Sequence, residues 1–390
     1  MSKLKYILSV SGKFHHFQVG QILHQRNQLI KIITGWPSIK LKNEKIPKEF
    51  IISDGIFNIL KYPFSSFPLM NPYLQLMSIY NKKNIDRIVC KFLEKNNEAD
   101  VLLGLAGVAL RSGRKILNNN KIFVCERSSS HIVFQDNLLA DEYKINNRKF
   151  YRAHNWIIEN ELKEYEMADM ILTPSNFVRN SFDKKNIKKV KVVNFGVNTK
   201  NFFRDENIKK NQKFFDILFV GAISLRKGLH YLLEAFQKFK HPNKRLHIVG
   251  NHTLDKDFFE KKIKKDGIVY HGHVNHYKLN NLYNNSHVFV LPSIEEGFAT
   301  VILQAAAAGC PVIVSENTGA AEFVKNNKIG FVVPIRDANA IANKLENLSE
   351  NKDLLVEFSD KAAKTMQKNT WSDYVDQVEN LILEIKKQKQ

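Results

Sequence analysis

The sequence predicts an α/β protein built from two Rossmann-like domains. Its 390 residues, of which 44% are hydrophobic, are more than one ordinary core accommodates. A buried-strand run leads through a glycine-containing turn into an amphipathic helix twice, first from Tyr6–Val10 and again from residues 217–220. The repeated order of strand, turn and helix predicts two such domains in succession, with a boundary near residue 200.

The chain is strongly basic, with 59 Lys and Arg against 39 Asp and Glu and a net charge of +20. This charge favours an anionic partner: a nucleotide, an acidic membrane surface or a nucleic acid. An AT-rich genome that enriches Lys, Asn and Ile would produce the same excess. A nucleic-acid-binding protein should gather basic residues on one element among aromatic residues, whereas here they spread along many helices.

Cysteine usage and apolar runs indicate a cytoplasmic protein. The three cysteines, Cys90, Cys125 and Cys310, lie apart and have no spacing typical of a disulfide framework or a metal site. The first apolar run is too short for a signal peptide. The longest run, residues 101–110, is half of the ~20 residues that a membrane span needs. We expect a soluble protein, or a peripheral one at the inner face of the cell membrane.

Two loops of the first domain follow strands, where open α/β sheets place ligands. The first contains Gly12 and His16, and its lone glycine fits a tight turn as well as a phosphate cradle because a complete G-x-G-x-x-G is absent. The second reads Glu-Arg-Ser-Ser-Ser-His and ends at His131. Residues 36–80 are rich in Pro and aromatic residues, which predicts a packed satellite core or, less favoured, an acceptor-binding insertion. Basic helices over residues 132–167 fit a solvated face or a membrane contact.

The second domain carries two cations at a helix start. After Gly221, residues 222–228 read Ala-Ile-Ser-Leu-Arg-Lys-Gly and precede a helix. Arg226 and Lys227 lie where the helix dipole disfavours cations unless an anion is bound. Further on, residues 292–315 read as loop, helix and strand, and the N–H groups of this helix start point into a turn beside Glu296. Such a helix start suits an anionic or hydroxyl-rich ligand.

This last stretch resembles the signature of the family 4 retaining glycosyltransferases of GT-B fold: Pro-Ser, a spacer, Glu-Gly-Phe-Gly and a second Glu after seven intervening residues. Glu296 matches the first Glu, and Gln304 stands in place of the second. The resemblance is strong over residues 168–198 and 217–385 and weak before 120. It implies two domains facing across a cleft and a C-terminal helix that crosses back to the first. The predicted boundaries are 1–200 for the acceptor side, 201–368 for the nucleotide-sugar-binding domain, and 369–390 for the helix.

The resemblance also implies residue roles. In the family the first Glu and the backbone after it hold the transferred sugar, the second Glu holds the ribose, and basic residues bind the donor diphosphate. Many members carry a cleft-facing His at about the position of His131, and the turn at residues 271–274 corresponds to the base-binding segment. The predicted catalytic residues are His131, Arg226, Lys227 and Glu296. The predicted donor-binding residues are Gly12, Gly221, His273, Val274, Gly297, Phe298, Ala299, Thr300 and Gln304.

We expect neither a metal nor a cofactor. His271, His273 and His276 lack a carboxylate or cysteine at ligand spacing. Residues 255–257 read Asp-Lys-Asp, a pattern that holds metal in the other major transferase fold, but here the pair precedes a helix and predicts capping. No second carboxylate is clearly placed as a nucleophile, so the resemblance implies attack and departure on one face of the sugar.

The sequence therefore predicts a metal-independent retaining glycosyltransferase that moves a hexose-type sugar from a nucleotide diphosphate sugar to an acceptor hydroxyl. The resemblance places it in the synthesis of cell-surface polysaccharide, lipopolysaccharide or glycolipid. The expected partners are the donor, a carbohydrate or lipid-linked acceptor, and an anionic membrane. The alternatives are a sugar-nucleotide epimerase or phosphorylase of the same fold, because a fold does not fix a reaction, and, less favoured, a nucleic-acid-binding protein.

Overall fold

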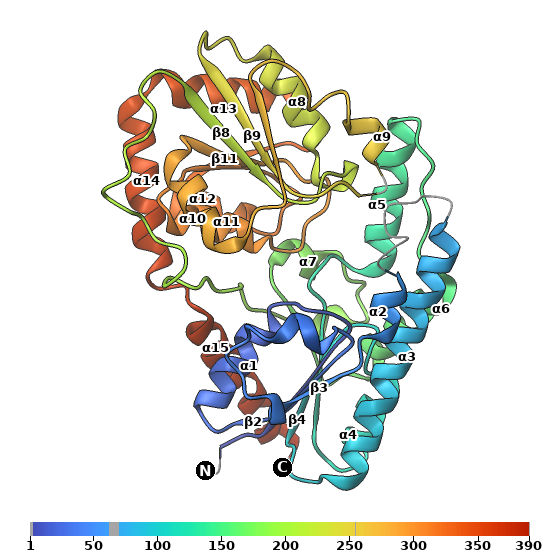
Figure 1. The fold of residues 1–390 in the computed structure, drawn as a ribbon. Coiled ribbons are helices and arrows are strands. Elements are labelled where there is room, and N and C mark those ends of the chain that lie inside the picture. The colour runs from blue at the N-terminus through green and yellow to red at the C-terminus, as the bar shows by residue number, and fades with distance from the viewer. Residues whose placement is uncertain (1–2, 62–69, 254, 390) are drawn as a thin grey trace.

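The computed structural model describes residues 3–61, 70–253 and 255–389. Two parallel sheets form separate α/β units, one above the other in Figure 1. The seven strands of the first follow the order β3-β2-β1-β4-β5-β6-β7, and the six strands of the second follow the order β10-β9-β8-β11-β12-β13. The predicted pair of Rossmann-like domains is confirmed. Residues 62–69, part of the predicted satellite core or insertion, lie outside the described residues.

The first sheet is covered by helices on both faces, so its central strands are buried along their whole length. Its strands are β1 (Tyr6–Val10), β2 (Leu29–Thr34), β3 (Ile51–Ser53), β4 (Val101–Leu105), β5 (Ile122–Glu126), β6 (Met170–Thr173) and β7 (Val190–Val192). Its α-helices are α1 (His16–Gln25), α2 (Ile56–Lys61), α3 (Asn71–Lys95), α4 (Leu110–Leu117), α5 (Ile132–Ile145), α6 (Asn155–Met167) and α7 (Asn176–Asn180).

The second domain repeats this plan. Its strands are β8 (Phe215–Val220), β9 (Lys244–Val249), β10 (Ile268–Gly272), β11 (Val288–Leu291), β12 (Val312–Ser315) and β13 (Gly330–Val333). Its α-helices are α8 (Leu229–Lys238), α9 (Lys256–Phe259), α10 (His276–Asn285), α11 (Thr300–Ala307), α12 (Ala321–Asn327), α13 (Ala338–Glu350) and α14 (Lys352–Met366). Strand β8 lies between β9 and β11, so the loops after β8 and β11 meet at one edge.

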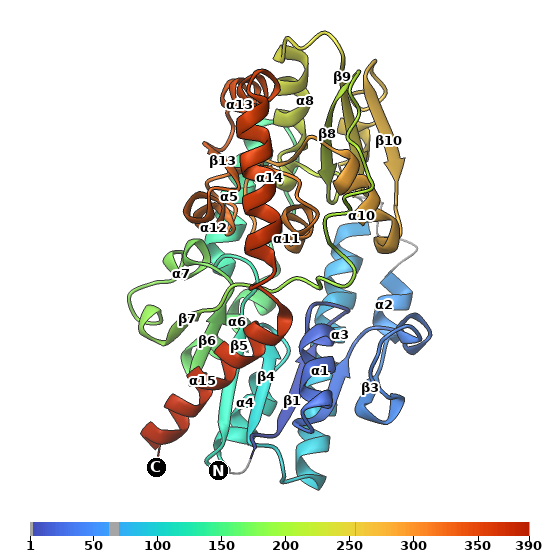
Figure 2. The ribbon, with the colours of Figure 1, turned by 90° about the vertical axis from the view of Figure 1, so that its left-hand side faces the viewer.

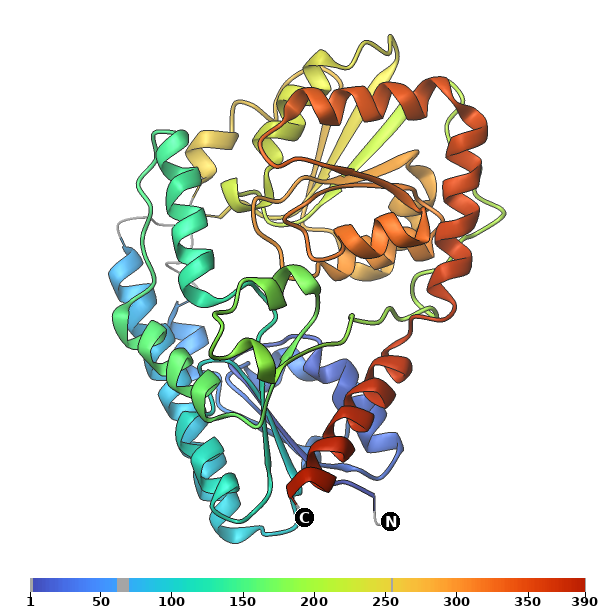
Figure 3. The ribbon, with the colours of Figure 1, turned by 180° about the vertical axis from the view of Figure 1, so that it is seen from behind.

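The last helix returns to the first domain, as predicted. The Val197 N–H donates to the Asn369 carbonyl (2.9 Å), so the segment leaving the first domain runs beside the segment returning to it. Helix α15 (Trp371–Lys389) then packs on α1, and Arg26 binds Asp376 at 2.6 Å. Figure 2 shows α15 across the first domain, and Figure 3 follows the chain there from α13 and α14. Among the described residues, no helix has the length and apolar character needed to cross a bilayer.

Helix α5 extends from the first domain along the second, close to α9 (Figure 1). Its Tyr143 hydroxyl donates to Asp255 (2.8 Å), and Arg148, just after the helix, binds Asp257 (2.6 Å). Asp255 occupies the N-cap position of α9 but makes no side-chain cap hydrogen bond, because its carboxylate accepts from Tyr143 and from the Leu225 N–H (3.1 Å). The predicted capping role is wrong: both aspartates serve the contact between domains.

Candidate active site

The starts of α8 and α11 meet at the sheet edge. The Ile294 N–H donates to the Arg226 carbonyl (2.9 Å), which joins the loop after β11 to the loop after β8. Gly228, with a φ of 67°, lies so close to Pro292 that a Cβ would be 1.9 Å from the Pro292 carbonyl oxygen. Any other residue at position 228 would strain the backbone and push the two loops apart.

Both helix starts lack a side-chain cap. The N-cap residues are Gly228 for α8 and Ala299 for α11, neither makes a side-chain cap hydrogen bond, and neither first turn holds an acidic residue. First-turn N–H groups have no partner within their helix and carry the positive end of its dipole. Two such ends at one site can hold an anion or several hydroxyl groups.

Lys227 and Glu296 form an ion pair between these helix starts. Lys227 ends the short 3-10 helix η6 (Leu225–Lys227), and Glu296 lies in the turn before α11. The two side chains are 18% and 11% exposed. Backbone hydrogen bonds fix the turn, since the Gly319 N–H donates to the Glu296 carbonyl (2.8 Å). The site thus presents one cation and one carboxylate beside two positive helix ends.

Arg226 forms an ion pair with Glu295, the residue before Glu296. Its Nε donates to Glu295 Oε2 at 2.9 Å. The buried Glu295 also accepts from the Ser130 N–H (2.9 Å), the Ser130 hydroxyl (2.8 Å) and the Gln135 amide (2.7 Å), all in the first domain. Burial alone would raise the pKa of Glu295, but Arg226 and these hydrogen bonds lower it to about 2. Arg226 therefore has a structural partner, and its predicted diphosphate contact remains a prediction.

Gly297 brings the two domains into direct contact. A Cβ at this position would lie 1.8 Å from the Ser128 carbonyl oxygen in the loop after β5. From the first domain, the Ser175 hydroxyl also donates to the Gly297 carbonyl (2.8 Å). The polar loop over residues 126–131 therefore lies directly against the turn that carries Glu296.

The same loop begins with a buried carboxylate that the sequence interpretation did not assign. Glu126 pairs with His15, lies 3.3 Å from His16 Nε2 and accepts from the Ser128 hydroxyl (3.0 Å). Burial would raise the pKa of Glu126, but the two histidines and Ser128 lower it to about 2. Burial lowers the pKa of His16 to about 4. At neutral pH Glu126 is ionised and His16 is neutral.

His15, His16 and Glu126 are of the residue types that bind a divalent cation. His15 and the Ser128 hydroxyl are direct partners of the Glu126 carboxylate, and His15 in turn stacks on Trp371 at 5.6 Å between ring centroids. The sequence indicated only that the loops carrying His15 and Glu126 both follow strands. Nothing in their spacing paired Glu126 with His15, because the strands β1 and β5 meet only through β4.

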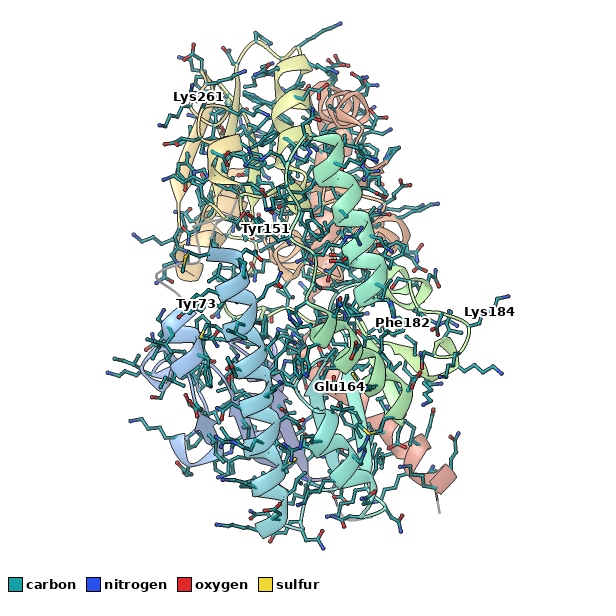
Figure 4. The ribbon with its side chains drawn as sticks, turned by 90° about the vertical axis from the view of Figure 1, so that its right-hand side faces the viewer. Tyr73, Tyr151, Glu164, Phe182, Lys184 and Lys261 are labelled. Atoms are coloured by element: carbon teal, nitrogen blue, oxygen red, sulfur yellow. The ribbon has the colours of Figure 1, made fainter. Side chains whose placement is uncertain are left out.

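The His131 ring lies among aromatic side chains of the first domain. The ring packs against Tyr165 (5.3 Å) and Phe182 (5.0 Å), the side chain is buried, and burial lowers its pKa. Figure 4 labels Phe182 near the lower end of α5, which His131 precedes. The neighbouring Ser130 still contacts Glu295 of the second domain, so the loop lies at the boundary between the domains. The contact of His131 with the donor sugar therefore stays a prediction.

The other predicted donor residues are distributed as follows. Gln304, on α11, accepts one hydrogen bond from the buried Tyr283 hydroxyl (3.2 Å), which leaves the second lone pair of its amide oxygen and its amide nitrogen for a ligand. Phe298 is buried and packs against Phe195 (6.0 Å), which leaves its backbone for a ligand.

Ala299 and Thr300 form the start of α11, and Gly221 directly follows β8. His273 and Val274 follow β10, and Gly12 lies in a tight turn whose carbonyl accepts from Thr34 (2.9 Å).

The two parallel sheets and the returning C-terminal helix define a fold of the GT-B class. The structure matches sucrose-phosphate synthase from Thermosynechococcus elongatus with a TM-score of 0.73, covering 98% of this chain and 99% of that chain at 18% identity. It also matches Anabaena HepE in complex with UDP, with a TM-score of 0.71, covering 98% and 100% at 14% identity. At these identities the likeness concerns the fold alone.

Residues 199–365 match the family described as glycosyl transferases group 1. The capsular polysaccharide biosynthesis glycosyltransferase CapM of Staphylococcus aureus is 32% identical over 165 residues, which is 39% of this chain and 43% of CapM. An uncharacterised glycosyltransferase of Methanocaldococcus jannaschii is 35% identical over 147 residues, which is 36% of this chain and 37% of that protein. The alignments thus span less than half of these curated relatives.

Proposed function

We propose that the protein is a retaining glycosyltransferase that moves a hexose-type sugar from a nucleotide diphosphate sugar to an acceptor hydroxyl. One observation carries the proposal: the Lys227–Glu296 pair lies between two helix starts without side-chain caps. A diphosphate offers the negative charge that these helix ends and the lysine can hold. A sugar offers hydroxyl groups to Glu296 and to the backbone after it.

The proposed catalysis is electrostatic. As the glycosidic bond breaks, negative charge grows on the leaving diphosphate and the sugar becomes oxocarbenium-like. Lys227 and the first-turn N–H groups of α8 and α11 are fixed before the reaction, so they stabilise that charge without reorganising. Glu296 pairs with Lys227 and orients it while holding the sugar. Because protein groups supply this stabilisation, the proposed reaction requires no metal, and attack and departure occur on the same face of the sugar.

The proposed acceptor side is the first domain. The loop that begins with Glu126 lies against Gly297, so an acceptor hydroxyl held by the first domain would lie next to the sugar. CapM acts in capsular polysaccharide biosynthesis, and HepE has been solved with UDP. We therefore infer a role in cell-surface polysaccharide or glycolipid synthesis on the cytoplasmic side of the membrane, and uridine nucleotides are the first donors to test.

The test is to incubate the protein with UDP-sugars and sugar or lipid-linked acceptors and to follow nucleoside diphosphate release and the product by NMR. We expect release that depends on an acceptor, a product with the anomeric configuration of the donor, and no loss of rate in EDTA. Conversion of the donor without an acceptor would indicate an epimerase, and a requirement for orthophosphate would indicate a phosphorylase. An inverted product or inhibition by EDTA would contradict the proposed mechanism.

A further inference from the structure

Helix α5 of the first domain contacts the second domain beside both helix starts of the candidate site. Its Gln135 donates to Glu295 in the turn before α11 (2.7 Å). Glu142 follows about two helical turns later, so it lies on the same side of the helix, and it meets α8. The helix also packs on η6, which ends with Lys227. Figure 3 shows α5 as the blue-green helix that runs up from the first domain beside the second.

Glu142 is a buried carboxylate whose partners come mainly from the second domain. Its Oε1 lies 2.8 Å from His230 Nε2 and accepts from the Tyr231 hydroxyl (3.1 Å). Its Oε2 accepts from Arg336 Nε (2.7 Å). From the first domain, the Asn146 amide donates to Oε1 (2.9 Å). Burial would raise the pKa of Glu142, but the hydrogen bonds from His230 and Arg336 lower it below its usual value, so the carboxylate is ionised at neutral pH.

Two of these bonds hold the first turn of α8. His230 and Tyr231 are the second and third residues of this helix and directly follow the loop that contains Gly228. An ionised carboxylate can only accept a hydrogen bond, so His230 carries its hydrogen on Nε2. The other ring nitrogen, Nδ1, is buried and has no hydrogen-bond partner among the residues that the structure describes. Glu142 therefore supplies the hydrogen bond that orients the His230 ring.

The third bond comes from a residue with an unfavourable backbone conformation. Arg336 lies in the turn between β13 and α13 and has a φ of 62°, in the left-handed region that residues with a side chain rarely adopt. Such a conformation persists where the surrounding contacts favour it. The turn that carries Arg336 and the first turn of α8 thus converge on one side chain of the first domain.

We propose that Glu142 is a positioning residue for the donor diphosphate: from the first domain it holds the first turn of α8 in the place where that turn binds the anion. The inference rests on the proposed function, in which Lys227 and the starts of α8 and α11 hold the diphosphate. Glu142 acts through His230 and Tyr231. A nucleoside has no phosphate to place at the helix start, so its binding does not depend on this contact.

Calorimetric titration with a nucleoside diphosphate and with its nucleoside tests the proposal. UDP, GDP and ADP are screened on the parent, and the tightest of them is compared with its nucleoside. Glu142→Gln keeps the size of the side chain and should weaken diphosphate binding by about tenfold or more, while nucleoside binding changes by less than about twofold. Removing a negative charge would by itself strengthen the binding of an anion, so weaker binding reports the lost position of the helix.

His230→Phe tests the same contact from the other side. It keeps a ring at this position and removes the hydrogen bond to Glu142, so it should show the same difference between diphosphate and nucleoside. This variant keeps the test informative if Glu142→Gln does not fold. In the transfer assay, both variants should raise the donor KM and leave the acceptor KM unchanged.

Asp257→Asn is the matched control. Arg148, just after α5, binds Asp257 at 2.6 Å, so this pair also joins the end of α5 to the second domain, but it does not involve α8. The control also removes one negative charge. It should bind the diphosphate and the nucleoside as the parent does.

The proposal is overturned if Glu142→Gln weakens the binding of diphosphate and nucleoside equally, because a general loss of structure would do so. It is also overturned if Asp257→Asn weakens diphosphate binding as much as Glu142→Gln does. If the parent binds none of the three nucleoside diphosphates, the proposed function has failed and this proposal fails with it. If the parent binds one of them and Glu142→Gln binds it equally well, this proposal alone has failed.

Discussion

Glu295→Gln tests the contact that ties the turn before α11 to the first domain. The substitution keeps the size of the side chain but removes the charge beside Arg226 and places an amide donor where one oxygen now accepts hydrogen bonds. The pKa of Glu295 is lowered from 4.5 to about 2, and about 2.5 pKa units correspond to about 3 kcal/mol. Removing one partner of a buried ion pair costs roughly 3–5 kcal/mol, less where the other partner is partly exposed, as Arg226 is. We expect a loss of about 2–3 kcal/mol in the free energy of unfolding.

Urea unfolding followed by circular dichroism measures this loss. The sign of the pH dependence follows from the lowered pKa: the contribution of Glu295 is complete above pH 4.5 and disappears as the pH falls toward 2. The free energies of unfolding of the parent and of Glu295→Gln should therefore converge as the pH falls. Glu322→Gln is the control, because Glu322 accepts from Asn176 across the domains (2.7 Å) in an exposed position and should cost less than about 0.5 kcal/mol. The reasoning would be refuted if Glu295→Gln and Glu322→Gln lost equal free energies of unfolding. It would also be refuted if the difference between the parent and Glu295→Gln stayed constant with pH.

Three further predictions concern single residues. Gln304→Ala should raise the donor KM by roughly tenfold, since a buried polar partner left unpaired costs about 1–3 kcal/mol, while Gln304→Glu keeps substantial activity; an unchanged KM would show that the ribose is held elsewhere. His131→Phe keeps the ring contacts with Tyr165 and Phe182 but removes the ring nitrogens, so it should lower turnover because His131 is predicted to contact the donor sugar; turnover equal to that of the parent would contradict this contact. The buried His16, with its pKa lowered from 6.5 to about 4, makes the folded state lose up to about 3 kcal/mol as the pH falls from 6.5 to 4. Urea unfolding of His16→Gln should lack this part of the pH dependence, and an identical dependence would contradict the assignment.

The order of elements could be predicted from sequence because local patterns determine it. Continuous apolar runs such as Tyr6–Val10 and Val288–Leu291 indicated buried parallel strands, and Gly228 and Gly309 marked a helix start and a helix end. The turn at Glu296 was found for the same reason, since its loop, helix and strand are contiguous. These signals need no knowledge of distant parts of the chain.

The contacts between distant segments could not be predicted. The pairing of Glu126 with His15 depends on strand order, and the direction of the His131 ring depends on Tyr165 and Phe182. Asp255 looked like a cap because its partner Tyr143 is 112 residues earlier. Gln135, on α5, helps to hold Glu295, so the position of Arg226 is also set by contacts between the domains.

Thermal shift with UDP, with uridine and with Lys227→Ala tests most directly that a nucleotide diphosphate binds between the two helix starts. A ligand at 100 times its Kd stabilises the folded state by about 2.7 kcal/mol. UDP should raise the Tm of the parent well above the effect of uridine, and Lys227→Ala should weaken UDP binding by about tenfold or more, because a charge-assisted hydrogen bond contributes roughly 1.5–3 kcal/mol. Equal shifts with UDP and uridine, or an unchanged affinity for UDP in Lys227→Ala, would contradict the proposed site.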